Sequence, residues 1–374
     1  MKILHVIQNL EKEKGGGVTA RNLKLIEYLE KKNNKNYILT LNSNIKNRSK
    51  KAFINKNRNY SLGFINNRFP LPFPNIFKIA KLVRNADVVH LTSFWTLLNA
   101  YVYIFCKLFS KNYVICPAGA LIIFGRSKII KHIYYQIIGK YIIKDCSAII
   151  SITTKEKEQF IERNIPLSKI FNIPNGIDLK SNVSNKSYKI HDINFKKKKP
   201  YILFVGRLNF IKGPDLLLNA FISIAEEIPY HNLIFAGSDE GMEKELKKEA
   251  INSRFAERIH FIGFISGSEK NSLYKNADIL VIPSRSEAMS LVVLEAALHG
   301  LESIFTDQCG LDELSKRKLG KCVKVDSNEI SNSIIKHIKS KNKINNLDLI
   351  DYVSNNYNWD KVSNKYIKVF KKLV

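Results

Sequence analysis

Cysteine is scarce in this sequence and is never arranged as a ligand set. The 374 residues contain five cysteines, an odd number, with no Cys-x-x-Cys motif and no Cys/His cluster. They are scattered through apolar segments, at Cys106, Cys116, Cys146, Cys309 and Cys322. This pattern argues against a zinc site and for a reducing cytosol. The apolar run over residues 2–7 is too short for a signal-peptide core, so we predict a first strand there and a cytoplasmic protein.

Two motifs of nucleotide-binding enzymes are also missing. A glycine run occurs at residues 15–17, but Gly-x-Gly-x-x-Gly is absent and no acidic residue follows at the distance that ribose binding requires. That absence argues against an oxidoreductase. Asp-x-Asp is absent as well, so a divalent metal that bridges a nucleotide diphosphate has no obvious site. We therefore expect no metal and no cofactor, with phosphate charge met by basic side chains and helix N-termini.

Long uncharged runs are rare, and the longest needs a membrane test. Residues 88–106 contain no Lys, Arg, Asp or Glu, a length that approaches a bilayer span. Polar residues are nevertheless clustered within it, at His90, Thr92, Ser93, Thr96 and Asn99. The pattern favours a buried strand, a loop and a helix over a transmembrane segment.

Positive charge is abundant. Sixty Lys and Arg stand against 33 Asp and Glu, a formal net charge of +27. Because Asn, Lys and Ile are all abundant, a lysine-rich background with no specific partner is one explanation of this charge, beside a nucleic-acid or an anionic-lipid partner. A nucleic-acid partner is not expected, because no RNA-binding aromatic pattern, KH loop or zinc finger accompanies the charge. Attraction to an anionic membrane is better supported, since residues 126–144 are basic, aromatic-rich and helix-periodic. A core-packed helix with a solvated lysine face explains that segment equally well, and both readings stay open here.

The chain alternates predicted strands and helices, which is typical of parallel α/β sheets. In the first half we predict a helix over 18–31 and strands at 2–7, 36–41, 88–91, 113–116, 148–152 and 170–173. In the second half we predict strands at 201–205, 232–236, 259–262, 279–282 and 303–306. The result is two doubly wound parallel-sheet domains, 1–178 and 201–355, facing across a cleft. A lysine-rich linker over 179–200 joins them, and a last helix covers 356–374.

The most informative stretch follows the predicted strand at 279–282. A polar loop carries Glu287, and the helix that it opens carries Glu295. Two helical turns separate these carboxylates, on the order of 12 Å at a rise of about 1.5 Å per residue. Between them a helix N-terminus offers backbone N–H groups, the natural seat for a phosphate. Two hydroxyl-binding carboxylates around an anion site would suit a nucleotide sugar.

Basic residues follow the strand that opens the second domain. Arg207 lies just after it, and Lys212 and Gly213 follow five residues later. An Arg fork and a compact Lys charge would clamp a diphosphate. Solvated basic residues are the simpler explanation for either one alone, but that explanation weakens beside Glu287 and Glu295. Residues 174–178 form a turn signature that we interpret as positioning the domain junction.

With these residues in view, the chain resembles family 4 of the retaining glycosyltransferases, the group 1 type with the GT-B fold of two Rossmann-like domains. The resemblance runs nearly end to end, and its motifs are specific in combination. They comprise residues 15–17, 87–90, 174–178, 206–208, 212–213, 236–237 and 263–264, Glu287-x7-Glu295, residues 310–313 and the terminal helix with its tryptophan.

The resemblance implies a role for each matched residue. Arg207 and Lys212 would hold the donor diphosphate, Glu287 would face the donor sugar and Glu295 would bind the ribose hydroxyls. Arg207, Lys212 and Glu287 are thus the expected catalytic residues. Backbone groups would complete the donor site, at Gly16, Gly17, Met289, Ser290 and Leu291. The C-terminal helix would return to the first domain.

Two departures from the family pattern bear on the site. Many relatives carry a Gly-Phe-Gly loop after the first glutamate, where this chain has Ala288-Met289-Ser290. Members also often place a His or Arg before the glycine that here is Gly119, whereas this chain has Ala118. Arg126 and His90 are candidates to supply the missing acceptor-side contact, although His90 is equally explained as a buried, hydrogen-bonded histidine.

The expected function is retaining transfer of a hexose from a UDP- or GDP-sugar to a glycan or lipid-linked acceptor. In a bacterial setting that would serve surface polysaccharide, such as O-antigen, capsule or lipopolysaccharide, with peripheral contact at the inner face of the plasma membrane. A front-face mechanism, in which the departing phosphate takes the acceptor proton, requires no protein base. The alternatives are a nucleotide-sugar epimerase or phosphorylase on the same fold, or a non-catalytic scaffold at the membrane.

Overall fold

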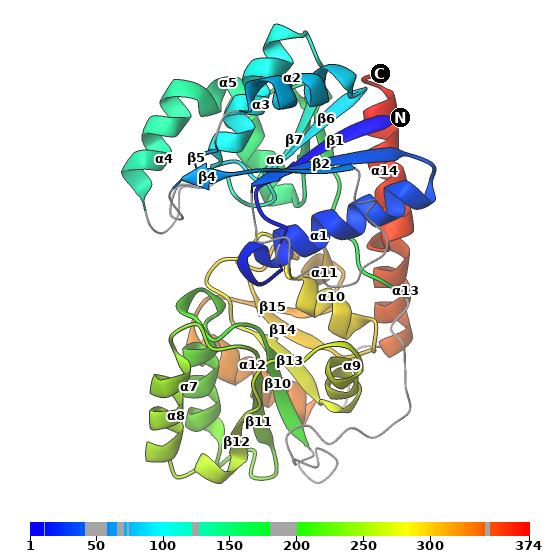
Figure 1. The fold of residues 1–374 in the computed structure, drawn as a ribbon. Coiled ribbons are helices and arrows are strands. Elements are labelled where there is room, and N and C mark those ends of the chain that lie inside the picture. The colour runs from blue at the N-terminus through cyan, green and yellow to red at the C-terminus, as the bar shows by residue number, and fades with distance from the viewer. Residues whose placement is uncertain are drawn as a thin grey trace. The chain divides into compact units, whose positions relative to one another are not determined.

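The computed structural model describes residues 1–10, 12–41, 58–65, 71–72, 75–121, 127–179, 200–340 and 345–374. Two compact units account for these residues (Figure 1). Unit 1 comprises Met1–Gly176 and Trp359–Val374, and unit 2 comprises Ile177–Asn358. The predicted linker, 179–200, lies almost entirely outside the described residues.

Unit 1 is built on a parallel sheet that, in its described part, has seven strands in the order β3-β2-β1-β6-β7-β8-β9. The strands are β1 (Lys2–Ile7), β2 (Lys35–Leu41), β3 (Asn59–Leu62), β6 (Val88–Thr92), β7 (Tyr113–Cys116), β8 (Ala148–Ser151) and β9 (Ile170–Asn172). A separate antiparallel pair is formed by β4 (Phe64–Ile65) and β5 (Leu71–Pro72).

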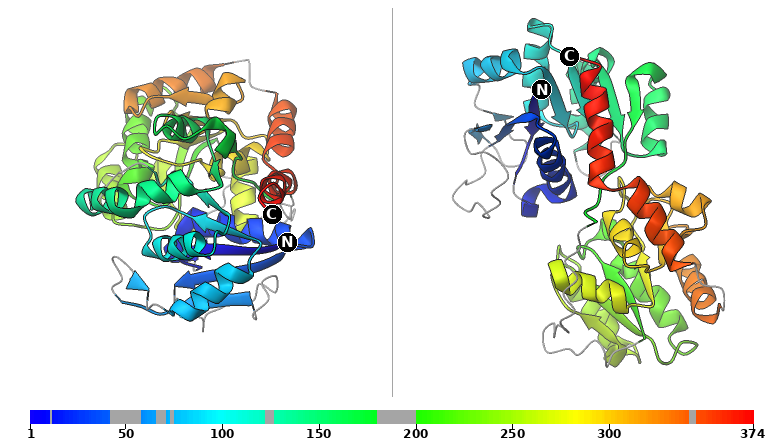
Figure 2. Two further views of the ribbon diagram at one scale, coloured as in Figure 1. Left: turned by 90° about the horizontal axis from the view of Figure 1, so that it is seen from above. Right: turned by 90° about the vertical axis from the view of Figure 1, so that its right-hand side faces the viewer.

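The helices of unit 1 lie on both faces of this sheet. They are α1 (Lys12–Lys31), α2 (Ile76–Asn85), α3 (Leu97–Leu108), α4 (Lys128–Tyr134), the π-helix η3 (Tyr135–Gly139), α5 (Lys140–Asp145), α6 (Thr154–Ile161), the 3-10 turn η4 (Leu167–Lys169) and α14 (Trp359–Lys371). The C-terminal helix α14 packs against α1 (Figure 2). Its Trp359 ring stacks on Tyr28, with the ring centroids 6.3 Å apart.

Unit 2 repeats the design with a six-stranded parallel sheet, counted over its described residues, in the order β12-β11-β10-β13-β14-β15. Its strands are β10 (Tyr201–Val205), β11 (Asn232–Ala236), β12 (Ile259–Phe261), β13 (Ile279–Ile282), β14 (Ser303–Thr306) and β15 (Lys321–Val323). Its helices are η6 (Phe210–Lys212), α7 (Pro214–Ile224), α8 (Glu243–Asn252), η7 (Ala256–Arg258), α9 (Gly267–Asn276), α10 (Leu291–Ala297), α11 (Asp312–Lys316), α12 (Ser327–Lys339) and α13 (Asn346–Asn356).

The prediction of two doubly wound parallel sheets is confirmed. Central strands such as β6, β7 and β13 are buried along their whole length. Parallel strands are covered by helices on both faces, so they form continuous apolar runs rather than alternating ones. That is why most of the predicted strands match those in the structure to within one residue at each end.

The uncharged segment 88–106 is not a membrane span. It forms β6, a short loop and most of α3, as predicted. Thr96 caps α3, since its hydroxyl accepts a hydrogen bond from the Asn99 N–H. Within the described part of the chain, no helix is both long and apolar enough to cross a membrane.

The first long helix begins earlier than the predicted residue 18, and this changes the expected role of the glycine run. Helix α1 begins at Lys12, so Gly16 and Gly17 lie inside it rather than in a loop before it. In a helix that starts there, their N–H groups are expected to bond to carbonyls one turn back, which removes them from a ligand. The Lys-Glu-Lys run over 12–14 favours helix, and adding one bond per residue extends a helix readily once it has formed.

Short strands at the margins were missed. β3 and β15 have only four and three residues, and β15 begins with an exposed lysine. Neither has an apolar run long enough to stand out from a loop.

Candidate functional site

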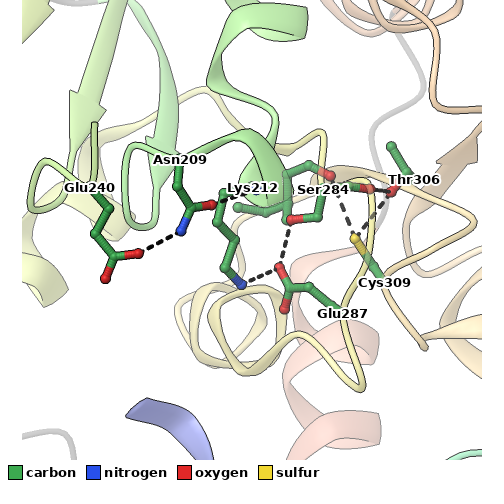
Figure 3. Close-up of polar contacts among 8 residues, drawn as sticks. Asn209, Lys212, Glu240, Ser284, Glu287, Thr306 and Cys309 are labelled. Carbon is green, nitrogen blue, oxygen red and sulfur yellow. Dashed lines mark hydrogen bonds and ion pairs between the residues drawn. The ribbon is translucent and has the colours of Figure 1, made fainter. Parts of the chain in front are cut away.

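The predicted ligand-binding loops of unit 2 follow adjacent strands. β10 pairs with β13, and the strand order reverses between them, because β11 lies on the other side of β10 and β14 on the other side of β13. Loops that leave two such strands at their carboxyl ends diverge to opposite faces of the sheet, which opens a crevice. The loop after β10 carries Arg207 and Lys212, and the loop after β13 carries Glu287. Figure 3 shows Lys212 and Glu287 pointing toward each other.

Lys212 is held at the end of a short 3-10 turn. The Asn209 side chain starts this turn by accepting a hydrogen bond from the Lys212 N–H, 3.0 Å away. Gly213 ends it in the left-handed region, with φ of 67°. A Cβ atom there would also lie 2.3 Å from the Pro283 carbonyl oxygen. Only glycine satisfies both conditions, and it brings the lysine turn against the loop after β13.

Arg285 ties the same two loops together. Its guanidinium forms a two-pronged ion pair with Asp215, at 2.8 and 2.5 Å. It also lies over the Phe210 ring, 4.0 Å from the centroid. Its backbone N–H donates to the Ile211 carbonyl at 2.7 Å. A planar guanidinium makes this combination possible and a lysine would not.

Lys212 and Glu287 meet directly. The Lys212 Nζ and Glu287 Oε1 atoms are 2.7 Å apart, across 75 residues of sequence. The Ser284 hydroxyl donates to the same carboxylate oxygen at 2.7 Å (Figure 3). The Glu287 backbone is fixed as well, because its N–H donates to the Gln308 carbonyl at 2.9 Å. The side chains are 23% and 10% exposed, so this pair is positioned by the protein yet reached by solvent.

Arg207, in the same loop as Lys212, forms a second ion pair, with Glu240 of the loop after β11. Its Nη1 atom is 2.7 and 3.0 Å from the two oxygens of Glu240. Asn209 donates to Glu240 at 2.7 Å, so this residue links Arg207 to the lysine turn. Burial opposes ionisation of Glu240, but the bonds from Asn209 and Arg207 outweigh it and hold its pKa below the usual value.

Glu240 and Asn209 were not anticipated from the sequence. Glu240 follows β11, the neighbour of β10, so the rule that ligand loops follow strand ends offered a signal. The two loops approach closely because Gly237 has no side chain. A Cβ atom on Gly237 would lie 1.7 Å from the Gly206 carbonyl oxygen.

Glu295 lies on α10, the helix that follows the Glu287 loop. Its Oε2 atom is 2.8 Å from the Lys270 Nζ atom and accepts a hydrogen bond from the Tyr274 hydroxyl at 3.1 Å. Burial, with a further contribution from Glu295, raises the pKa of Tyr274 well above its usual value, so the tyrosine is a donor. Glu295, which we expect to bind the ribose, is thus one-third exposed. Two residues of α9 that the sequence did not reveal, Lys270 and Tyr274, orient it.

The predicted backbone donors after Glu287 are only partly in place. Ser290, the residue before α10, donates its N–H to the Cys309 carbonyl at 2.9 Å, so this N–H already has an acceptor other than the phosphate that the resemblance implied. The loop after β14 packs alongside and takes that donor. Met289 is buried, whereas Leu291 starts α10, where helical N–H groups have no intrahelical acceptor.

The Ala118–Gly119 turn of unit 1 is built on left-handed backbone. Both residues have positive φ, 53° and 82°, and the Ala118 methyl group is buried. Glu156, which sequence reasoning missed, accepts hydrogen bonds from the Gly119 and Ile152 N–H groups, each at 2.7 Å. Burial raises the pKa of this carboxyl. Arg126, the other acceptor-side candidate, lies outside the described residues.

His90 is a core residue, so the structure favours the second of its two explanations, a buried and hydrogen-bonded histidine, over a contact with an acceptor. Its side chain has no exposed surface, and its Nδ1 atom is 3.1 Å from Nδ1 of His5. His5 in turn bonds to Asn36 at 3.0 Å. Tyr366 and Phe370 of α14 cover the His90 ring, each with a centroid 5.7 Å away. Burial lowers the pKa of His90 well below its usual value, so the ring is neutral.

Two family models match this chain and together span most of it. The model described as Glycosyltransferase Family 4 matches residues 15–181, and the model described as Glycosyl transferases group 1 matches residues 186–353. The expected family is therefore confirmed.

Other proteins are similar to parts of this chain in sequence. An uncharacterized glycosyltransferase of Methanocaldococcus jannaschii, MJ1607, is 29% identical over 60% of this chain and 59% of that protein. An uncharacterized 41.2 kDa protein in the cps region of Klebsiella pneumoniae is 26% identical over 76% of this chain and 78% of that protein. The chain thus matches less than two-thirds of the first relative's length.

Solved structures share the whole fold. Anabaena Alr3699/HepE, in complex with UDP, superposes with a TM-score of 0.81 at 17% identity, over all of both chains. At that identity the likeness shows the fold, which is the predicted GT-B architecture.

Proposed function

This chain belongs to the group 1 type of glycosyltransferase family 4, and on that premise we propose that it moves a hexose from a UDP- or GDP-sugar to a glycan or lipid-linked acceptor with retention of configuration. The observation that carries the proposal is the contact between Lys212 and Glu287, 2.7 Å apart at the ends of two adjacent strands. A cation suited to a leaving phosphate and a carboxylate suited to sugar hydroxyls lie side by side there.

Charge is the main requirement of this reaction. When the bond between the sugar C1 and the phosphate oxygen breaks, the nucleoside diphosphate leaves with the electron pair. Lys212 and Arg207 follow the same strand, and both would exchange a carboxylate partner for phosphate oxygens as the donor binds. Charge stabilisation prepared in this way is often the largest single contribution to catalysis. We propose that these two cations suffice without a metal ion or other cofactor.

The remaining residues would orient the donor. Glu287, anchored through Oε1, would accept hydrogen bonds from sugar hydroxyls, and Glu295 would accept them from the ribose. The acceptor hydroxyl would attack C1 on the face that the phosphate leaves, and its proton would pass to the departing phosphate oxygen. No protein base is needed for that step.

The setting we propose is surface polysaccharide assembly, such as O-antigen, capsule or lipopolysaccharide, in a bacterium. One relative belongs to a cps region, which supports this setting. The acceptor would be met at the inner face of the plasma membrane, and nucleic acid is not a proposed partner.

Incubation with a panel of UDP-, GDP- and ADP-sugars tests the proposal. We expect slow hydrolysis of one donor in the absence of acceptor, with NMR showing that the released sugar first appears in the donor's anomeric configuration. Release in the opposite configuration would contradict retention. Conversion of the intact sugar nucleotide into an epimer would instead identify an epimerase on the same fold.

A further inference from the structure

The helical segment over residues 127–145 of unit 1 is apolar on two sides. One side packs into the core of the unit, through Tyr134, Tyr135, Ile138, Ile142 and Ile143. A second set of large apolar side chains is exposed, and we call it the outer face: Ile129, Ile130, Ile133, Ile137 and Tyr141. A helix at the surface of a soluble protein usually has one apolar side. The outer face therefore needs an explanation that the core does not supply.

The outer face is a set and not a scatter of single residues. Ile129, Ile133, Ile137 and Tyr141 recur every four residues, and residues four apart in a helix are neighbours on one side. In an α-helix such a series drifts slowly around the axis, but the π-helix η3 lies in its middle and has a wider turn that counteracts the drift. Ile129 and Ile137 are 77% and 69% exposed. Figure 1 shows α4 at the periphery of unit 1, away from β1 and β6.

Up to its last residue, Asp145, this segment carries charge of one sign. Lysines occur at 128, 131, 140 and 144, and no Asp or Glu occurs from 127 to 144. Three of these lysines, Lys128, Lys140 and Lys144, are exposed. Isoleucines bordered by lysines fit an interface with apolar chains below and phosphate headgroups above, since lysine stems extend to keep the ammonium in water. A second copy of the chain would bring the same cations together, which makes it a poorer occupant.

We propose that the outer face is a membrane-docking surface for a bilayer rich in anionic lipid. This inference rests on the proposed function, which places the acceptor at a membrane. It resolves the two readings of the segment that the sequence left open, because the segment uses different residues for the core and for the bilayer. Each lysine near an anionic surface adds to the attraction. Insertion of the outer-face isoleucines into the bilayer would make the contact specific to this face.

Sedimentation with lipid vesicles tests the proposal on the full chain. We expect wild type to bind vesicles of phosphatidylcholine with phosphatidylglycerol and to bind pure phosphatidylcholine much less. The double variant Ile133→Glu/Ile137→Glu should partition at least about tenfold less, because both charges would enter the apolar layer. The control is Ile251→Glu, since Ile251 is 72% exposed on α8 of unit 2, and it should bind like wild type.

Two results would overturn the proposal. Equal vesicle binding by the double variant would show diffuse attraction by a chain of charge +27 and no docking face. If light scattering shows that wild type is a dimer and the double variant a monomer, the outer face is instead the interface with a second copy of the chain. Donor hydrolysis without vesicles is measured on the same samples and should be equal in all variants. If no variant hydrolyses a donor while the vesicle results hold, the proposed function fails and the docking surface stands.

Discussion

The two units share a topology but use their strand ends differently. In both sheets the second and third strands lie on one side of the first strand, and the fourth strand of the sheet lies on its other side. In unit 2 the charged groups of this region, Lys212, Glu287 and Arg207, are between 10% and 52% exposed. In unit 1 the comparable polar groups, such as His90 and Glu156, are fully buried.

The C-terminal helix accounts for part of the difference. Tyr366 of α14 is fully buried in unit 1 and accepts a hydrogen bond from Arg21. The same guanidinium reaches the Cys116 sulfur at 3.1 Å, where β7 ends. These polar side chains therefore bond to one another beneath a helix. A doubly wound sheet thus offers a position for a ligand, while the exposure of the side chains there decides whether a ligand can use it.

The largest expected effect is on turnover, through the exposed site of unit 2. Lys212→Ala should lower kcat with the preferred donor by about 10²–10³, because removing a charge stabiliser from the transition state typically costs that much. The control is Lys244→Ala, an exposed lysine of α8 in the same unit, which should leave kcat unchanged. A Lys212→Ala enzyme with normal kcat would remove the distinction between the two units that we draw.

The buried groups of unit 1 should appear instead in the pH dependence of stability. Burial lowers the pKa of His5 to about 4, although its bond to Asn36 opposes the shift. Its stabilising contribution is present above the unfolded pKa of about 6.5 and is lost as pH falls toward 4. From His5 alone we expect unit 1 to lose about 3 kcal/mol of unfolding free energy over that window, and His90, whose pKa burial also lowers, should add to the loss.

Tryptophan fluorescence measures this loss selectively, since Trp95 and Trp359, the two tryptophans of the sequence, belong to unit 1. Urea unfolding at several pH values gives the unfolding free energy as a function of pH. Its slope between pH 6.5 and 4 should be smaller in His5→Gln than in wild type. A slope that is unchanged in the variant would show that the acid sensitivity arises elsewhere.

A smaller effect is expected for nucleotide affinity. Glu295→Ala should weaken binding of the preferred nucleoside diphosphate about tenfold, because a charged hydrogen-bond partner of the ribose is lost. Glu257→Ala, which removes an exposed carboxylate of unit 2, is the matched control. Calorimetry measures both, and normal affinity in Glu295→Ala would contradict the ribose assignment.

The smallest effect concerns orientation of Arg207. Glu240→Ala should lower kcat/KM about threefold, since half-exposed ion pairs contribute little and Glu240 acts only by holding Arg207 and Asn209. Steady-state kinetics at low substrate measures it. A loss as large as that of Lys212→Ala would mean that Glu240 contacts the donor itself.

The sequence predicted the strands because buried parallel strands are long apolar runs, and it predicted the loops of Arg207, Lys212 and Glu287 because each follows such a run. It did not reveal Glu240 or Lys270, since their partners lie 33 and 25 residues away and are brought close only when the sheet and its helices have packed. The sequence also did not decide between the two explanations of His90. The helix that covers it begins 269 residues later, and one neutral histidine on a strand fits both an active site and a core.

Titration of UDP, GDP and ADP into the full chain tests the central claim most directly, namely that the loops after β10 and β13 form the nucleotide-sugar site. We predict that one of the three binds with one site per chain, and that Lys212→Ala weakens this binding at least about tenfold while Lys244→Ala leaves it unchanged. Failure of all three nucleotides to bind, or equal affinity in Lys212→Ala and wild type, would contradict the account.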